Sequence, residues 1–436
     1  MTETFVSVTA AVLLVLTYAL IVSEKVNRAV AALLGGSLVV LLGILSQQQA
    51  IAAIDFNTLG LLTGMMIIVA VTRKSGLFGY CAIKAAQIVK ASPAGILAAL
   101  ALVAGVVSAG LDNVTTVLLI APVTFIICKE LRVPVYPFLF AEILASNIGG
   151  AATLIGDPPN ILIGSATGLT FNDFLLNVGP VAAAIMAMQI VICQLIWGRK
   201  LKATAEDRAR VMELHPDSAI TDRYLLACSL TVIGATLATF ALAEEFHLQT
   251  ATIAMSGAAV LLLLDNLRHP VHLHSENVGK AFVEVEWVTL FFFIGLFIVV
   301  GGVERTGLLE AAARRLSAVT HGSITATAGV VLWSSAVLSA FLDNIPFVAT
   351  MIPVVKGLAP SLGGPEAVRP VWWALSLGAC LGGNGTLVGA SANLAVAGIA
   401  ERNGVPFSFV KFTLLAFPMM LASIAVAHLY LWLVFL

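Results

Sequence analysis

Charged residues are scarce in this sequence. Only 11% of the 436 residues are Asp, Glu, Lys or Arg, whereas soluble domains carry about 25%. The formal net charge is −1 at pH 7. Nucleic-acid-binding proteins depend on a basic surface that neutralises phosphates, so the composition argues against a nucleic-acid partner.

Cysteine pairs and nucleotide-binding motifs are also missing. Because the five cysteines lie far apart and no CxxC pair occurs, neither a zinc site nor a disulfide framework is indicated. No GxxxxGK[ST] phosphate loop is present, so any ATP dependence must come from a partner protein. We therefore expect no metal and no cofactor. The N-terminus lacks a basic region and a cleavage site, and we interpret it as a retained transmembrane helix.

Hydrophobic residues make up 59% of the chain, and the mean hydropathy is +1.01. Apolar stretches of about 20 residues recur from end to end, which is the length needed to cross a bilayer of ~30 Å. We count about ten full spans and two pairs of shorter apolar segments. The sequence therefore predicts an all-α integral membrane protein.

One long polar segment, residues 199–223, divides the apolar sequence into two halves. Basic residues are concentrated in this segment, at Lys25 and Arg28, and between Arg73 and Lys90. Under the positive-inside rule these regions are cytoplasmic. The prediction is a first repeat over 1–198 with about five crossings, a cytoplasmic linker over 199–223, and a second repeat over 224–436 in the opposite orientation.

The two halves share motifs at a constant spacing. Ser108–Asn113 matches Ser339–Asn344 at an offset of 231 (343 − 112 = 231). Gly149–Asn160 matches Gly382–Asn393 at an offset of 233 (386 − 153 = 233). Inverted repeats of this kind are common in secondary transporters, where the substrate site lies at the repeat interface near the bilayer midplane.

A polar pair interrupts an apolar run in each half, and we predict re-entrant hairpins near 94–131 and 324–357. An aspartate at membrane depth is costly, so the tip residues are candidates for function, although simple helix capping is an alternative. The predicted tip residues are Asp112, Asn113, Thr115 and Thr116 in the first half and Asp343 and Asn344 in the second.

A glycine-rich segment in each half should be a discontinuous helix, because its glycines and the Pro158-Pro159 pair cannot sustain one continuous helix. The predicted binding residues of these segments are Asn147, Thr153, Asn160, Asn384, Thr386 and Asn393. Asp157 has no acidic counterpart, since Ala390 takes its place. The site should therefore have similar backbones and unequal charge. Cys380 replaces Asn147 and is either a thiol ligand or a packing residue.

The motifs Leu111-Asp-Asn-Val-Thr-Thr116 and Asn147-Ile-Gly-Gly-Ala-Ala-Thr-Leu-Ile-Gly-Asp-Pro-Pro-Asn160 resemble those of the ion transporter superfamily, over nearly the whole chain. Within this superfamily, the residues of the two motifs are most similar to those of the arsenical-pump membrane proteins (arsenite permeases) and the P-protein group. The sodium/dicarboxylate branch usually has Ser-Asn-Thr at its hairpin tips. The Asp-Asn tips of this chain depart from that pattern and argue against a dicarboxylate substrate.

This resemblance implies a multi-pass protein of the prokaryotic inner membrane, in contact with membrane lipids. It implies a scaffold and a transport domain, a homodimer with elevator-like alternating access, and export of arsenite and antimonite in exchange for protons. A cytosolic ATPase assists some members. Asparagines such as Asn113, Asn147, Asn344 and Asn384 would bind the neutral hydroxide. Proton exchange would fall to Asp112, Asp157 or Asp343.

Two alternatives differ in cargo or chemistry. A sodium/proton antiporter or an anion carrier would keep the same fold. An intramembrane aspartyl protease would use Asp112 and Asp343 as a dyad, but the Gly-x-Gly-Asp surroundings typical of such residues are absent. We therefore expect a transporter and not an enzyme.

Overall fold

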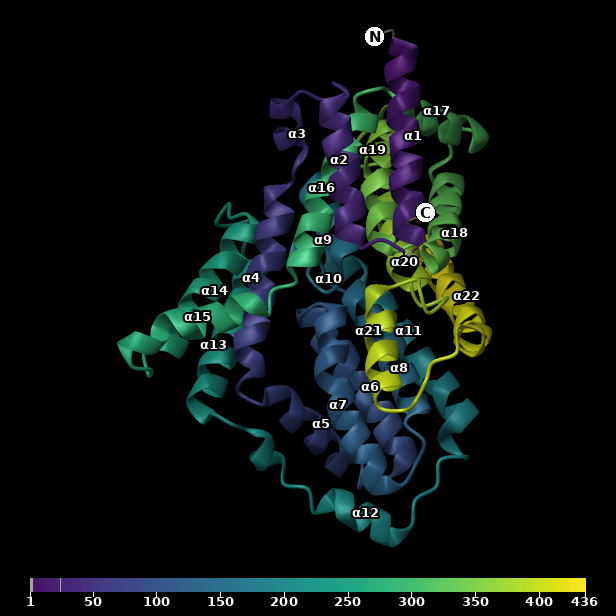
Figure 1. Ribbon diagram of the computed structural model, residues 1–436. Coiled ribbons are helices and arrows are strands. Elements are labelled where there is room, and N and C mark those ends of the chain that lie inside the picture. The colour runs from purple at the N-terminus through teal and green to yellow at the C-terminus, as the bar shows by residue number, and fades with distance from the viewer. Residues whose placement is uncertain (1–2, 24) are drawn as a thin grey trace.

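The protein is built from helices joined by short connections, and the computed structural model describes residues 3–23 and 25–436. Figure 1 shows the arrangement. The helices of the first half are α1 (Glu3–Val22), α2 (Arg28–Leu41), α3 (Gln47–Ala53), α4 (Phe56–Arg73), α5 (Leu77–Ile88), α6 (Pro93–Gly110), α7 (Asn113–Leu131), α8 (Tyr136–Ala151), α9 (Pro158–Thr167), α10 (Phe171–Asn177) and α11 (Gly179–Cys193).

The linker carries two short elements and is followed by a second set of helices. After a π-helical turn η1 (Gln194–Gly198), these are α12 (Ala205–Met212), η2 (Pro216–Ala219), α13 (Arg223–Ala241), α14 (Thr250–Asn266), η3 (Val271–Leu273), α15 (His274–Val283), α16 (Trp287–Glu304), α17 (Leu308–Val319), α18 (Ile324–Phe341), α19 (Asn344–Leu362), α20 (Arg369–Gly382), α21 (Ser391–Arg402) and α22 (Phe409–Val434).

Ten helices of the described residues are long and apolar enough to cross a membrane. Four of them are the hairpin arms α6, α7, α18 and α19, with 18 or 19 residues each. The sequence predicted ten spans in addition to shorter arms, and the arms are longer than expected. The reason is that each apolar run is broken at two residues only, such as Leu111 and Asp112, which keep an extended backbone between the arms.

The second half repeats the first in order and in the opposite orientation. The short amphipathic helices α5 and α17 each follow a glycine in the left-handed conformation, Gly76 (φ 83°) and Gly307 (φ 73°). Figure 1 shows α5 near one end of the molecule and α17 near the other. The fold is an all-α membrane architecture of two inverted repeats, each with a hairpin and a discontinuous helix, as the sequence predicted.

Helices of one half pack against helices of the other. Helix α4 lies against α14, and α2 lies against α16. A Cβ atom added to Gly64 would lie 2.5 Å from the carbonyl carbon of Ala254, and one added to Gly295 would lie 2.3 Å from that of Ala32. Small residues allow membrane helices to approach backbone to backbone. The same kind of close contact therefore occurs twice: a glycine of the first half meets the backbone of the second half, and a glycine of the second half meets the backbone of the first.

Each hairpin packs on the discontinuous helix of its own half. Helix α6 lies on α8, and α18 lies on α20. A Cβ atom on Gly149 would lie 2.0 Å from the carbonyl oxygen of Gly105, and one on Gly382 would lie 2.6 Å from that of Ala336. Glycine at these points places the hairpin tip directly beside the break in the discontinuous helix.

The linker is attached to the base of the first hairpin. Arg210 donates a hydrogen bond to the backbone oxygen of Glu130 at 2.9 Å, and Arg208 donates to that of Lys90 at 2.8 Å. Asp207 accepts hydrogen bonds from Thr204, which lower the pKa of its carboxyl group and keep it charged beside Arg210. The domain boundaries 1–198, 199–223 and 224–436 stay a proposal.

Candidate functional site

Both hairpin tips are capped by their aspartates. The Asp112 carboxylate accepts a hydrogen bond from the Thr115 backbone N–H at 2.8 Å, and the Asp343 carboxylate accepts one from Ile345 at 3.1 Å. The capping role considered from the sequence is thus present at both tips. It leaves a second oxygen on each carboxylate for another partner.

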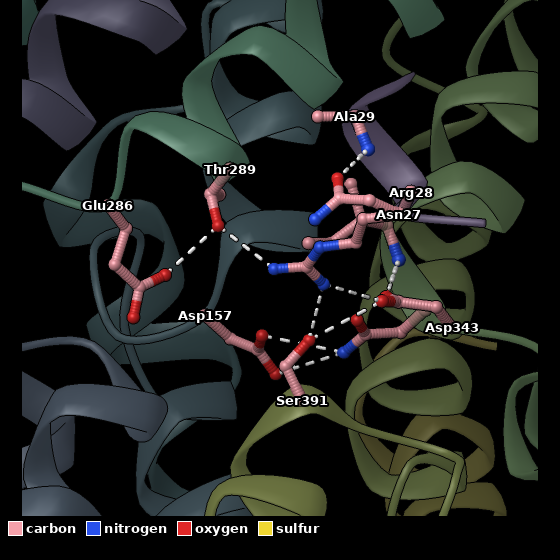
Figure 2. Close-up of polar contacts among 10 residues, drawn as sticks. Asn27, Arg28, Ala29, Asp157, Glu286, Thr289, Asp343 and Ser391 are labelled. Atoms are coloured by element: carbon pink, nitrogen blue, oxygen red, sulfur yellow. Dashed lines mark hydrogen bonds and ion pairs between the residues drawn. The ribbon is translucent and has the colours of Figure 1, made fainter. Parts of the chain in front are cut away.

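At the second tip that partner is Arg28, the first residue of α2. Its guanidinium lies 3.1 Å from the Asp343 carboxylate and donates to the Ser391 hydroxyl at 2.7 Å. Figure 2 shows these side chains converging from three different helices. In the sequence, Arg28 belongs to a basic cluster that indicates the cytoplasmic side. An arginine directly at the start of an apolar helix, after the Asn27 cap, was the available signal for a second role.

The other face of Arg28 joins it to α16. Its second nitrogen donates to the Thr289 hydroxyl at 2.9 Å, and Thr289 donates to Glu286 at 2.9 Å. The guanidinium carbon also lies 5.4 Å from the ring centroid of Phe292, within range of a cation–π contact. A cavity of about 540 Å³ borders this group, between the α1–α2 connection, the second tip and the start of α21.

A cluster of buried amides lies between the discontinuous helices. The Asn147 amide donates to Asn384 at 2.8 Å and to Asn393 at 2.9 Å, and the Asn113 amide donates to the Asn147 oxygen at 3.0 Å. We call these four residues the amide cluster. All of them are buried. Since Asn113 and Asn147 come from the first half and the other two from the second, the cluster joins the repeats at their interface.

Asp157 lies at the start of α9 and is buried. The Asn344 amide of the second tip is 3.4 Å and 3.5 Å from its two carboxylate oxygens. Hydrogen bonds of this length are weak. No ion pair reaches Asp157 within the part of the chain that the structure describes. The carboxylate present in the first half only is thus placed next to the tip of the second.

Four of the predicted binding residues hold the unwound segments together. Asn160 donates both amide hydrogens to the backbone oxygens of Ala151 and Thr153, at 3.1 Å and 2.9 Å. Asn393 does the same with the oxygens of Gly383 and Thr386. The Thr153 hydroxyl donates to Ala109 O, and the Thr386 hydroxyl donates to Ala340 O. These bonds satisfy buried carbonyls that no helix pairs. Cargo contact by these four residues stays a prediction.

Replacing Asn160 with alanine should destabilise the protein, because it leaves two buried carbonyl oxygens without donors. We expect a loss of about 1–3 kcal/mol in the free energy of unfolding. A fluorescence-monitored thermal unfolding curve in detergent measures it. Asn403→Ala is the matched control: its amide donates to Ile399 at an exposed helix end, and its removal should leave the curve unchanged. Equal midpoints for Asn160→Ala and Asn403→Ala would contradict the clamping role.

The remaining candidates lie close to these groups, and one of them has no side-chain partner among the described residues. The Thr116 hydroxyl is buried and has no hydrogen-bond partner among the described residues. Thr115 contributes its backbone N–H to the first tip and remains partly exposed. The Cys380 thiol lies 3.6 Å from the Asn160 oxygen, which also accepts from Ser376 at 2.6 Å. Cys380 is therefore a buried neighbour of Asn160, whose amide holds the unwound segment of the first half together.

Inverted repeats whose hairpin tips and helix breaks meet in a buried polar layer define a membrane transporter. The chain belongs to the citrate transporter family (CitMHS), within the ion transporter superfamily, because the family model matches residues 18–378. It is a transporter and not an enzyme.

Several relatives match nearly the whole of this chain. The chain is 44% identical over 431 residues to an uncharacterized transporter of Mycobacterium tuberculosis, and the match covers 98% of both proteins. It is 41% identical over 434 residues to a 46 kDa membrane protein of Mycobacterium leprae, covering 99% of both. It is also 35% identical over 513 residues to the P protein of Homo sapiens, covering 98% of this chain and 60% of that protein.

Two solved structures share the fold. The YdaH transporter of Alcanivorax borkumensis, described as having an unusual topology, matches with a TM-score of 0.60 and 16% identity over 88% of this chain and 86% of that one. MtrF of Neisseria gonorrhoeae, described with a class of antimetabolite efflux pumps, matches with a TM-score of 0.51 and 13% identity over 86% and 80%. At these identities the likeness concerns the architecture alone.

Proposed function

We propose that the protein exports the neutral hydroxides arsenite and antimonite in exchange for protons. The observation that carries the proposal is the amide cluster at the repeat interface. Its asparagines and the unpaired Thr116 hydroxyl offer neutral donors and acceptors, which match the hydroxyl groups of a neutral hydroxide.

The charges around the cluster favour a cargo that is not an anion. Asp112, Asp157 and Asp343 lie at the tips and the first helix break. The arginine at the second tip, Arg28, is already paired with Asp343. A multiply charged carboxylate would meet net negative charge here, and like charges juxtaposed cost several kcal/mol. A neutral hydroxide avoids that repulsion.

Exchange requires that a proton and the cargo exclude one another at the site. An ionised Asp157 makes only weak contacts with Asn344 and can therefore accept a proton. Once it is protonated, the neutral acid attracts the Asn344 amide less strongly, because the hydrogen bond is no longer assisted by a charge. Protonation therefore changes the contact between the halves. In an elevator-like cycle, such a change allows the tip and the helix break to separate on one side of the membrane.

Purified protein in liposomes tests the proposal. With an acidic lumen and an alkaline exterior, outward proton movement should drive arsenite uptake above that of protein-free vesicles. Asp157→Asn should reduce the rate at least tenfold, since the exchanged proton has lost its carrier. Nigericin, which collapses the gradient, should abolish the uptake. Wild-type uptake no greater than that of empty vesicles would reject arsenite as cargo.

The cavity beside Arg28 favours a second candidate, an anion carrier. The guanidinium and the N-termini of α19 and α21 face this cavity, and helix N-termini attract anions. In the same vesicles, citrate or chloride uptake that exceeds arsenite uptake would establish this alternative. Proton release that requires sodium would instead establish a sodium/proton antiporter.

The setting of the transporter is part of the proposal. We place it in the prokaryotic inner membrane, surrounded by lipid, as a homodimer that operates with or without a cytosolic ATPase. The linker with α12 lies at one end of the molecule (Figure 1) and would be the surface nearest such a partner.

A further inference from the structure

Glu142 is a buried carboxyl group that belongs to none of the sequence motifs. It lies in the middle of α8, with none of its surface exposed. One carboxyl oxygen is in hydrogen-bond contact with the Thr124 hydroxyl of α7. The other oxygen has no hydrogen-bond partner within the described residues. An ionised carboxylate in these surroundings would cost several kcal/mol.

The second repeat provides an internal control for this position. At the offsets of 231 and 233, the counterparts of Thr124 and Glu142 are Val355 on α19 and Leu375 on α20. Both are fully buried. The same packing position between hairpin and discontinuous helix is thus filled by two apolar side chains in one half and by a hydroxyl and a carboxyl in the other. Packing alone does not require an acid here.

The hydrogen bonds around Thr124 indicate the protonation state. Its hydroxyl lies 3.3 Å from the Ile120 backbone oxygen, four residues earlier in α7, and also contacts Glu142. A hydroxyl has one hydrogen, and a carbonyl oxygen can only accept. The Thr124 hydroxyl is placed to donate to Glu142, and its contact with Ile120 is the longer one. Both contacts are hydrogen bonds at once only if a protonated Glu142 donates to Thr124, which frees the Thr124 hydrogen for Ile120.

No basic side chain neutralises Glu142 among the described residues. The helices packed most closely against α8 are α6, α7, α11, α20 and α21, and α22 meets α8 through the Phe140–Phe412 ring contact. The acidic, basic and thiol side chains of these helices are Cys128, Lys129 and Glu130 on α7, Cys193 on α11, Arg369 and Cys380 on α20, Glu401 and Arg402 on α21, and Lys411 and His428 on α22, whereas α6 has none. None of the basic ones forms an ion pair with Glu142 among the described residues. Of these, Cys128 lies one turn beyond Thr124 on α7, and a neutral thiol does not neutralise a carboxylate.

We propose that Glu142 binds and releases one proton during the transport cycle, on the first-half side of the amide cluster. It precedes Asn147 by five residues on the same helix, a rise of about 7.5 Å. The proton stays on Glu142 while α7 packs against α8. When the hairpin arm moves away, water reaches the carboxyl group, which ionises and passes its proton to that water. The inference rests on the proposed proton-coupled transport and adds a site to it.

Infrared spectroscopy of the purified protein in lipid tests the site without any cargo. A protonated carboxyl group in an apolar environment has a C=O band apart from the amide bands. We expect such a band in the wild type at neutral pH, with loss of intensity in Glu142→Gln. The control Glu401→Gln, at an exposed helix end, should keep the full band. An unchanged band in Glu142→Gln would overturn the proposal.

Transport assays test the role in the cycle. The double variant Thr124→Val/Glu142→Leu copies the second repeat and should fold with a thermal midpoint at least equal to that of the wild type. We expect it to lose at least tenfold in uptake driven by a pH gradient and to keep exchange of labelled for unlabelled arsenite without a gradient. Gradient-driven uptake at the wild-type rate would also overturn the proposal. If the wild type moves no arsenite, the infrared band of Glu142 still decides whether this carboxyl group holds a proton, so failure of the cargo assignment stays distinct from failure of this inference.

Discussion

Alanine in place of Gly149 should prevent the protein from reaching its folded state. The added Cβ atom would lie 2.0 Å from the Gly105 carbonyl oxygen and 2.6 Å from two further backbone atoms of that residue. Backbone cannot move aside as the end of a flexible side chain can, so α6 and α8 would have to separate. Ordinary overpacking of a core costs about 1–3 kcal/mol, and we expect more than this. Size-exclusion chromatography of a fluorescent fusion should show at least a tenfold loss of the monodisperse peak.

Gly234→Ala is the matched control for that experiment. Gly234 lies in α13, and a Cβ atom there would meet nothing within 4 Å. Alanine is favoured over glycine inside a helix by roughly 0.5–1 kcal/mol, so the variant should be as stable as the wild type or more so. A normal chromatographic peak and thermal midpoint for Gly149→Ala would show that α6 and α8 do not pack as closely as described.

Removal of Arg28 should reduce both the stability of the second tip and the rate of transport. Arg28→Ala leaves Asp343 without its cation and breaks the bonds to Ser391 and Thr289. Loss of one partner from a buried ion pair costs about 3–5 kcal/mol. Because the two side chains are 25% and 17% exposed, we expect a loss of about 2 kcal/mol in the free energy of unfolding, measured as a lower thermal midpoint, together with a lower rate of gradient-driven uptake.

A double variant separates charge from packing at this position. Arg28→Ala/Asp343→Asn removes the uncompensated carboxylate and should recover part of the thermal midpoint that Arg28→Ala alone loses. Arg73→Ala is a matched control, since its ion pair with Glu284 is about half exposed and such pairs contribute about 0–1 kcal/mol. Similar losses for Arg28→Ala and Arg73→Ala would refute the special role of the Arg28 ion pair.

The architecture could be predicted because the sequence contains an internal repeat, so each structural motif occurs in both halves. The constant offset of the Asp-Asn tips identified the repeat, and glycine and proline marked the breaks that α8–α9 and α20–α21 show. Apolar patterning locates a membrane helix but does not state how far an arm continues, which is why α6 and α7 came out longer than expected.

Several partners at the site depend on contacts between distant segments, and sequence spacing does not report those. Arg28 reaches Asp343 across 315 positions, and Asn147 reaches Asn384 across 237. Glu142 was passed over because it is a single acid in an apolar run, with no motif around it. When the two halves of the sequence are aligned at the offset of 233, Glu142 stands opposite the apolar Leu375 and is recognised as an exception. A systematic comparison of charged residues between the halves would have found it.

The crossed pairing of the halves has a consequence for biosynthesis. Helices α2 and α4 leave the ribosome well before α16 and α14, against which they pack backbone to backbone. During that interval the surface around Gly64 has no protein partner and must be covered by lipid or by the insertion machinery. Until the second half is inserted, the first half is therefore a folding intermediate that lacks its partner helices. A truncated product that ends at the linker would keep this surface without its partner helix, and we expect it to be degraded and not to accumulate.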